Sequence, residues 1–225
     1  MKETRVASGP FLSRLWFEAH EFDDIAREKL KCHGLLPREP APIDIELFVE
    51  VEFGFAYEFR NLGEDCLGLM NFSEKGPKSL FIHSKLDKPE NPTVNRRCRS
   101  TLAHECGHGL LHAGLFAELW ESKRRTNSFA DSTRLITWQE RAENFDAEQK
   151  PTAKEWWEYQ ANQMISCLLL PLAPLRNALR AFGLEPATLR ESNLWADSLL
   201  FSFLSETFDI SLDVARIRLE RLYSE

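Results

Sequence analysis

TLAHECGHGLLH, residues 101–112, places histidines at positions 104, 108 and 112 and a glutamate directly after the first of them. Residues four apart in an α-helix lie on nearly the same face, with their Cβ atoms roughly 5–6 Å apart, so His104 and His108 can both direct an imidazole nitrogen at one metal ion. Glu105 leaves the helix about 100° further round, close enough to reach a water molecule on that ion. The stretch therefore predicts a helix with two metal ligands and a general base.

The third histidine of this stretch does not fit the same ion. His112 lies about 12 Å along the helix axis from His104 and about 80° round it, so one ion cannot be reached by both. Cys106 points to another side of the helix and is expected to be a small buried residue. A catalytic zinc site has three protein ligands and one open position, so the third ligand must come from another part of the chain.

A later stretch, EWWEYQANQMISCLLLP at 155–171, supplies a candidate. Glu158 and Asn162 are four apart, on a helix whose other residues are suited to a core. The carboxylate can complete a His-His-Glu site, and the amide can accept a hydrogen bond from a ligand histidine and fix its tautomer. Taken alone, Glu158 would be read as a solvated surface acid; beside the helix of residues 101–112, the ligand interpretation is favoured.

Composition and charge narrow the class of protein. The chain has 225 residues, of which 43% are hydrophobic, and a net charge of −7, which disfavours direct binding to nucleic acid or to an anionic membrane. Its five cysteines include no CxxC pair, as is typical of a reducing compartment. The longest apolar run, 164–172, is too short to span a bilayer. We therefore expect a soluble, cytoplasmic protein.

The pattern along the chain predicts an α+β fold. Three β-prone runs are expected to form a small antiparallel meander packed on the two ligand-bearing helices. Residues 1–180 form the predicted main domain, with 113–150 as an insertion or lid, and 181–225 form a helical C-terminal extension. The expected strands are 53–59, 66–72 and 78–84; the expected helices are 11–31, 43–52, one starting near 94–99, and then 115–123, 152–170, 173–182, 189–208 and 211–223.

Together, TLAHECGHGLLH and EYQANQMISCLLLP resemble the ImmA/IrrE metallopeptidases, in which an HExxH helix precedes an E-x-x-A-N segment that runs into leucines and a proline. The resemblance extends to PIDIE at 42–46, CLGLM at 66–70 and RCRSTLAHE at 97–105, and covers roughly residues 20–175. It implies a zincin-like fold, one zinc ion held by His104, His108 and Glu158, and Glu105 as catalytic base. Two departures stand out: 49 residues separate His108 from Glu158, a long spacing for the family, and we do not expect the N-terminal helix-turn-helix that many members carry ahead of the peptidase core.

The resemblance implies an intracellular zinc endopeptidase that cleaves a specific regulatory protein in trans, of the helix-turn-helix repressor or antitoxin type. His112 and Tyr159 are candidate donors to the oxyanion or supports of the ligands, with plain packing roles at least as well supported. The alternative is a metal-binding regulatory module that acts through protein or DNA contacts without cutting. If the last predicted strand has a free edge near the site, an extended substrate can add to it.

The C-terminal run FLSETFDISLDVARIRLERLYSE at 203–225 has apolar residues at helical spacing on both sides of an FDIS turn. Arg216, Arg218 and Arg221 follow the turn and would suit a helix-turn-helix fragment that touches DNA. A packed helical pair with a solvated basic face is the favoured interpretation, because the net charge of the chain is negative.

Overall fold

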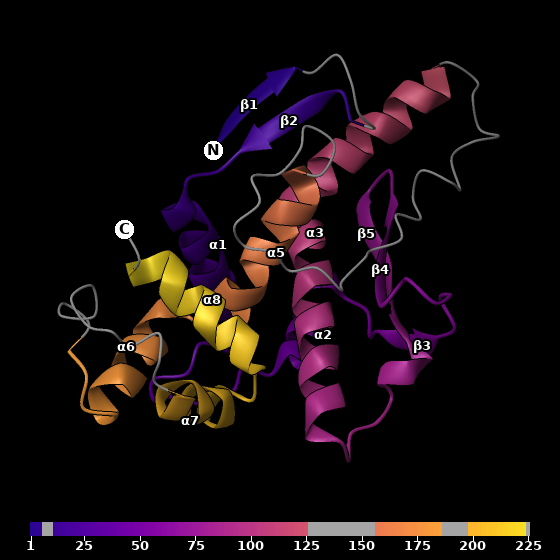
Figure 1. Ribbon diagram of the computed structural model, residues 1–225. Helices are drawn as coiled ribbons and strands as arrows, with labels where there is room; N and C mark the ends of the chain where they lie inside the picture. The colour runs from indigo at the N-terminus through magenta and orange to yellow at the C-terminus, as the bar shows by residue number, and fades with distance from the viewer. Residues whose placement is uncertain (6–10, 126–155, 186–197, 224–225) are drawn as a thin grey trace.

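The computed structural model describes residues 1–5, 11–125, 156–185 and 198–223 (Figure 1). These residues form an α+β structure with seven α-helices and two small sheets. None of the described helices combines the length and the apolar composition that a bilayer crossing would need. Most of the predicted insertion or lid at 113–150, and the start of the predicted helix 189–208, lie outside the described residues.

Helix α3, Pro92–Arg125, is the central element of the fold and carries the stretch quoted above. Pro92 suits the first helical position, and the side chain of Asn91 caps the helix by accepting hydrogen bonds from the amides of Thr93 and Val94. The helix predicted to begin near 94–99 and the one predicted at 115–123 are therefore a single helix. Its 34 residues correspond to a length of about 50 Å.

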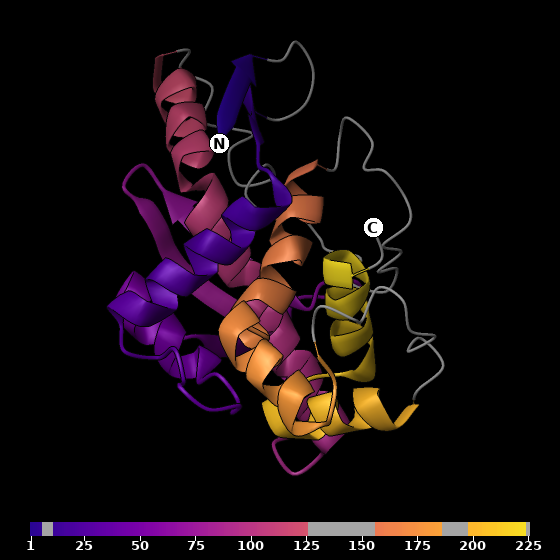
Figure 2. The same cartoon turned by 90° about the vertical axis from the view of Figure 1, so that its left-hand side faces the viewer.

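Helix α3 separates a three-stranded sheet from a group of helices. The sheet contacts one side of α3, and α5, Trp156–Leu169, packs along the other (Figure 1). Helix α1, Ala19–Cys32, packs on α5, and the turned view places both in front of α3 (Figure 2). The remaining helices are α2, Ile45–Phe53; α6, Leu172–Ala181; α7, Ser198–Phe208; and α8, Leu212–Tyr223.

The three-stranded sheet is mixed, so the predicted antiparallel meander is wrong. Its strands are β3, Glu58–Arg60; β4, Gly68–Ser73; and β5, Gly76–His83, in the spatial order β3-β5-β4. Strands β4 and β5 form the expected antiparallel hairpin, but the chain after β3 crosses over, so that β3 pairs with the far edge of β5 in parallel. Strand β5 is thus central, which excludes the free edge expected for the last strand. Within the described residues, β4 pairs only with β5.

Residues 11–18 were expected to begin a helix and instead contain a strand. Phe11, Ser13 and Leu15 are buried, whereas the residues between them are more exposed, which is the alternation of a strand on a packed surface. Helix α1 begins only at Ala19, after Glu18, whose backbone amide donates to the side chain of Glu21 in the first turn at 2.9 Å. This strand is β2, Ser13–Trp16, and it forms an antiparallel hairpin with β1, Lys2–Arg5.

The C-terminal helices pack on the helices that carry the site, and their arginines do not form a solvated basic face as expected. Arg218 of α8 is fully buried, pairs with Asp23 of α1 and donates to the carbonyl of Leu170. Arg221 is also largely buried beside Asp23, and only Arg216 lies in solvent. The expected packed pair of helices is present, but Arg218 and Arg221 lie in its contact with α1 instead of in solvent.

The turn between α7 and α8 is attached to the first part of α3. Arg96 donates to the carboxylate of Asp209, and Arg99 donates to the backbone carbonyl of the same residue at 3.0 Å. Arg99 also donates to the carbonyl of Ile43, ahead of α2. The arginines that precede the quoted stretch therefore fix α3 to two other parts of the fold. The predicted domain boundary near residue 180 stays a prediction.

Candidate metal centre

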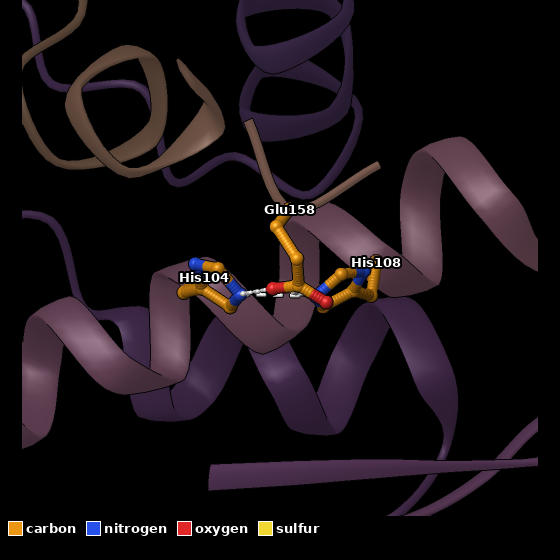
Figure 3. A group of neighbouring side chains, drawn as sticks. All are labelled: His104, His108 and Glu158. Carbon is orange, nitrogen blue, oxygen red and sulfur yellow. Dashed lines mark hydrogen bonds and ion pairs between the residues drawn. The ribbon is translucent and has the colours of Figure 1, made fainter. Parts of the chain in front are cut away.

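Three side chains converge between α3 and α5, as Figure 3 shows. His104 and His108 lie one turn apart on α3, with their Nε2 atoms 3.0 Å apart. Oε2 of Glu158, from the first turn of α5, lies 3.4 Å from each of these nitrogens. Both histidines are buried and Glu158 is partly buried. Among the described residues, this is the group of histidine, cysteine or acidic side chains that could hold a metal ion.

The spacing of the three donor atoms fits a zinc ion. A point in their plane and equidistant from them lies about 1.9 Å from each, which follows from side lengths of 3.0, 3.4 and 3.4 Å. Zinc binds imidazole nitrogen at roughly 2.0–2.1 Å and carboxylate oxygen at roughly 2.0–2.2 Å. The three donor atoms are therefore close enough together for His104, His108 and Glu158 to hold one zinc ion, and two imidazoles with one carboxylate are a donor set that zinc accepts.

Two further side chains hold the ligands in this orientation. Oδ1 of Asn162 lies 2.8 Å from Nδ1 of His104. The amide oxygen can only accept, so Nδ1 carries the proton and Nε2 presents its lone pair to the centre. The indole Nε1 of Trp157 donates to Oε1 of Glu158 at 2.8 Å, which leaves Oε2 facing the histidines. The contact of Asn162 was expected from the sequence, whereas that of Trp157 was not.

Burial and the carboxylate act on the histidine pair in opposite ways. Burial, helped by the neighbouring His108, lowers the pKa of His104 to about 3. Burial also disfavours the charged form of His108, but the carboxylate of Glu158 outweighs it, so the pKa of His108 lies above 6.5. The carboxylate of Glu158 therefore favours positive charge at this centre, against the effect of burial.

Glu105, the predicted base, lies between α3 and the sheet. It is 2% exposed, and its Oε2 accepts a hydrogen bond from the backbone amide of Met70 in β4 at 2.6 Å. Met70 is paired with Leu80 of β5, yet its amide points away from β5 and toward α3. Gly68 makes room for the glutamate, because a Cβ there would lie 2.6 Å from Glu105 Oε1. Strand β4 therefore fixes the position of Glu105.

His112 lies outside the group of three side chains, one turn further along α3 than His108. It is fully buried, its Nδ1 lies 3.0 Å from Nδ1 of His108, and its Nε2 lies 3.0 Å from Oε1 of Gln160. With both ring nitrogens engaged, it is placed to support His108 rather than to bind an oxyanion. Tyr159, the other candidate, is 41% exposed, and its side chain leaves α5 about 100° round from Glu158.

Two glycines of α3 allow the neighbouring elements to approach the centre closely. A Cβ on Gly107 would lie 3.0 Å from the Cα and the carbonyl oxygen of Ala161 in α5. A Cβ on Gly109 would lie 2.7 Å from the ring of Phe53, at the end of α2. Glycine inside a helix costs about 1 kcal/mol relative to alanine, so the close contacts offset an intrinsic disadvantage.

The sequence identified the three converging side chains, the glutamate on the same helix and the amide of Asn162, but it missed Trp157, Gln160 and the amide of Met70. A tryptophan directly before a candidate ligand was the one visible signal for the first of these. Comparison of the chain with family models, curated proteins and solved structures found no match. Its function therefore has to be inferred from the residues of the site.

Proposed function

We propose that the chain is a zinc-dependent endopeptidase of the ImmA/IrrE type with a zincin-like core. The observation that carries this proposal is the convergence of His104, His108 and Glu158 at distances that fit one zinc ion. The buried Glu105 directly follows His104 in the sequence. The sequence resemblance of the two ligand-bearing stretches to that family supports the same conclusion.

In this proposal, bound zinc would supply Lewis-acid chemistry, which lowers the pKa of water from 15.7 towards roughly 7 and polarises a scissile carbonyl. Glu105 accepts a proton from the attacking water as the new C–O bond forms, and then passes it to the amide nitrogen, so that the C–N bond breaks and the amine leaves. Asn162 and Trp157 keep His104 and Glu158 oriented during the reaction. The Met70 amide keeps Glu105 in place.

The substrate we propose is an extended segment of an intracellular regulatory protein, of the helix-turn-helix repressor or antitoxin-like type. Strand β4 pairs with β5 on one side only within the described residues, and its outer side faces Glu105 through Met70. A peptide that pairs with this edge beside Met70, whose own amide bonds Glu105, would run past the base in extended form. The regulatory nature of the substrate comes from the family resemblance.

The competing candidate is a metal-binding module that regulates through protein or DNA contacts without cutting. Its DNA form loses support from α8, because Arg218 is fully buried and Arg221 is only partly exposed. A module that acts through protein contacts differs from the endopeptidase in one testable respect: it does not need Glu105 as a base.

The experiment compares Glu105→Gln with Glu118→Gln, a matched change at an exposed position of the same helix. Zinc content is measured on the purified full chains, and cleavage is followed by mass spectrometry with helix-turn-helix regulators encoded near its gene. We expect Glu105→Gln to keep zinc and to lose cleavage at least about 100-fold, and Glu118→Gln to behave as wild type. Glu158→Ala should lose zinc as well. Full regulatory activity of Glu105→Gln in cells would refute hydrolysis as the function.

A further inference from the structure

A chain of hydrogen bonds runs from the N-terminal hairpin to His108. Its first member is the backbone carbonyl of Leu15 in β2, which lies 2.7 Å from Nε2 of Gln160. A carbonyl oxygen only accepts, so the amino group of Gln160 must face Leu15. The amide oxygen of Gln160 then faces Nε2 of His112 at 3.0 Å. The orientation of this amide is thus set by a strand 145 residues earlier in the sequence.

The tautomer of each histidine follows from the orientation of Gln160. Its oxygen accepts, so Nε2 of His112 carries a proton and donates. His112 is fully buried and faces a neutral amide, which favours an uncharged ring with a lone pair on Nδ1. That lone pair lies 3.0 Å from Nδ1 of His108, which therefore donates, so that Nε2 is the nitrogen of His108 that would give its lone pair to a metal ion at the centre.

We propose that Gln160 and His112 are positioning residues that fix the metal-binding tautomer of His108 from strand β2. The amide of Asn162 fixes the tautomer of His104 by a direct hydrogen bond, whereas the amide of Gln160 fixes that of His108 through the ring of His112. This inference deepens the proposed function, since it rests on His108 being a metal ligand, and it adds two residues and a hairpin to the machinery of the site.

The residues around this chain of hydrogen bonds disfavour the other tautomer of His112. Gln160 is 6% exposed and His112 is fully buried, and the ring of Trp156 packs edge-on against His112 with centroids 5.8 Å apart. If Nδ1 of His112 carried the proton instead, its Nε2 lone pair would face the oxygen of Gln160 at 3.0 Å. Two buried acceptors at that separation repel each other, which disfavours this tautomer.

The test uses the full chain and its Gln160→Leu variant, with Gln163→Leu as the matched control on the same helix. Gln163 contacts Arg221 of α8 instead of the site, so its loss affects packing but not the histidines. Zinc affinity is measured by competition with a chelator, and melting temperature is recorded for each protein. We expect Gln160→Leu to lower the zinc affinity ~10–100-fold, and Gln163→Leu to lower it less than threefold.

A second measurement keeps the inference falsifiable even if Gln160→Leu fails to fold. Nitrogen-15 NMR of the zinc-free wild-type protein reports which ring nitrogen of each histidine carries the proton. We expect the Nε2-protonated tautomer for His112. The opposite tautomer, or a folded Gln160→Leu variant with unchanged zinc affinity, overturns the inference. If the wild type binds no zinc at all, the proposed function fails, and the tautomer of His112 still tests the hydrogen-bond chain.

Discussion

Gly107 of α3 and Ala161 of α5 face each other so closely that a Cβ on Gly107 would lie 3.0 Å from the backbone of Ala161. This approach brings Glu158, three residues before Ala161, within 3.4 Å of both ligand histidines. The two helices make the most extensive contact between any pair of elements in the described chain. The position of the third ligand thus depends on a residue that has no side chain.

Gly107→Ala is expected to push α5 away from α3, lower the free energy of unfolding by about 1–3 kcal/mol and weaken zinc binding. Gly114→Ala is the matched control on the same helix, because a Cβ there meets nothing within 4 Å. It should stabilise the protein by up to about 1 kcal/mol, since alanine is the better helix former. Denaturant unfolding and chelator competition measure both effects. Equal behaviour of the two variants would show that the close approach is unimportant.

Asn162→Ala should lower zinc affinity by ~10–100-fold, because His104 loses the acceptor that keeps the proton on Nδ1. Asn162→Asp keeps an acceptor at that position and should retain most of the affinity. Asn177→Ala, at an exposed amide on α6, is the control and should change nothing. If Asn162→Ala binds zinc like the wild type, the orientation of His104 is set by some other contact.

The zinc-free protein should become less stable as the pH falls from 6.5 to 5. Burial, more than any other cause, lowers the pKa of both His104 and His112 to about 3, so below pH 6.5 the unfolded chain binds protons that the folded chain does not. Each of these histidines should reduce the free energy of unfolding by roughly 1.4 kcal/mol per pH unit. The pKa of His108 is raised, so the stability that this residue contributes is fully present below pH 6.5 and is lost only as the pH rises above that value. His108 therefore does not change the slope between pH 6.5 and 5. Urea unfolding at several pH values measures the slope, which His112→Gln should halve; a flat profile would contradict the prediction.

Asp23→Ala should lower the free energy of unfolding by about 3 kcal/mol, because it leaves the fully buried guanidinium of Arg218 without its carboxylate. Asp24→Ala, the neighbouring change on α1, removes an exposed ion pair with Arg27 and should cost less than about 1 kcal/mol. Thermal and urea unfolding of the two variants provide the comparison. Similar losses would mean that the buried pair does little to hold α8 on α1.

The features of the site that depend on a single helix were predictable from the sequence. Spacing along α3 and α5 places His104 beside His108 and Glu158 one turn before Asn162, and helical geometry is nearly independent of the rest of the fold. The support of His108 was not predictable in this way. It depends on Leu15 meeting Gln160, a contact between distant segments that no local pattern records.

The errors in the predicted fold have a similar cause. Leu12, Leu15, Trp16 and Ala19 are spaced as on a helical face, but the same residues fit a strand followed by a helix that starts at Ala19. Packing of Phe11 and Leu15 into the core decides for the strand. The parallel pairing of β3 with β5 involves three residues of β3 and depends on how the chain crosses the sheet, which its sequence pattern does not encode.

The fixing of α3 at Asp209 and at the metal centre limits how this chain can change in evolution. Arg99 and His104 lie on one uninterrupted helix, the first attached to the α7–α8 turn and the second to Asn162. Inserting or deleting one residue between them would turn one attachment by about 100° relative to the other. Natural variation in length must therefore fall outside the stretch from Arg96 to His112, which is buried along almost its whole length.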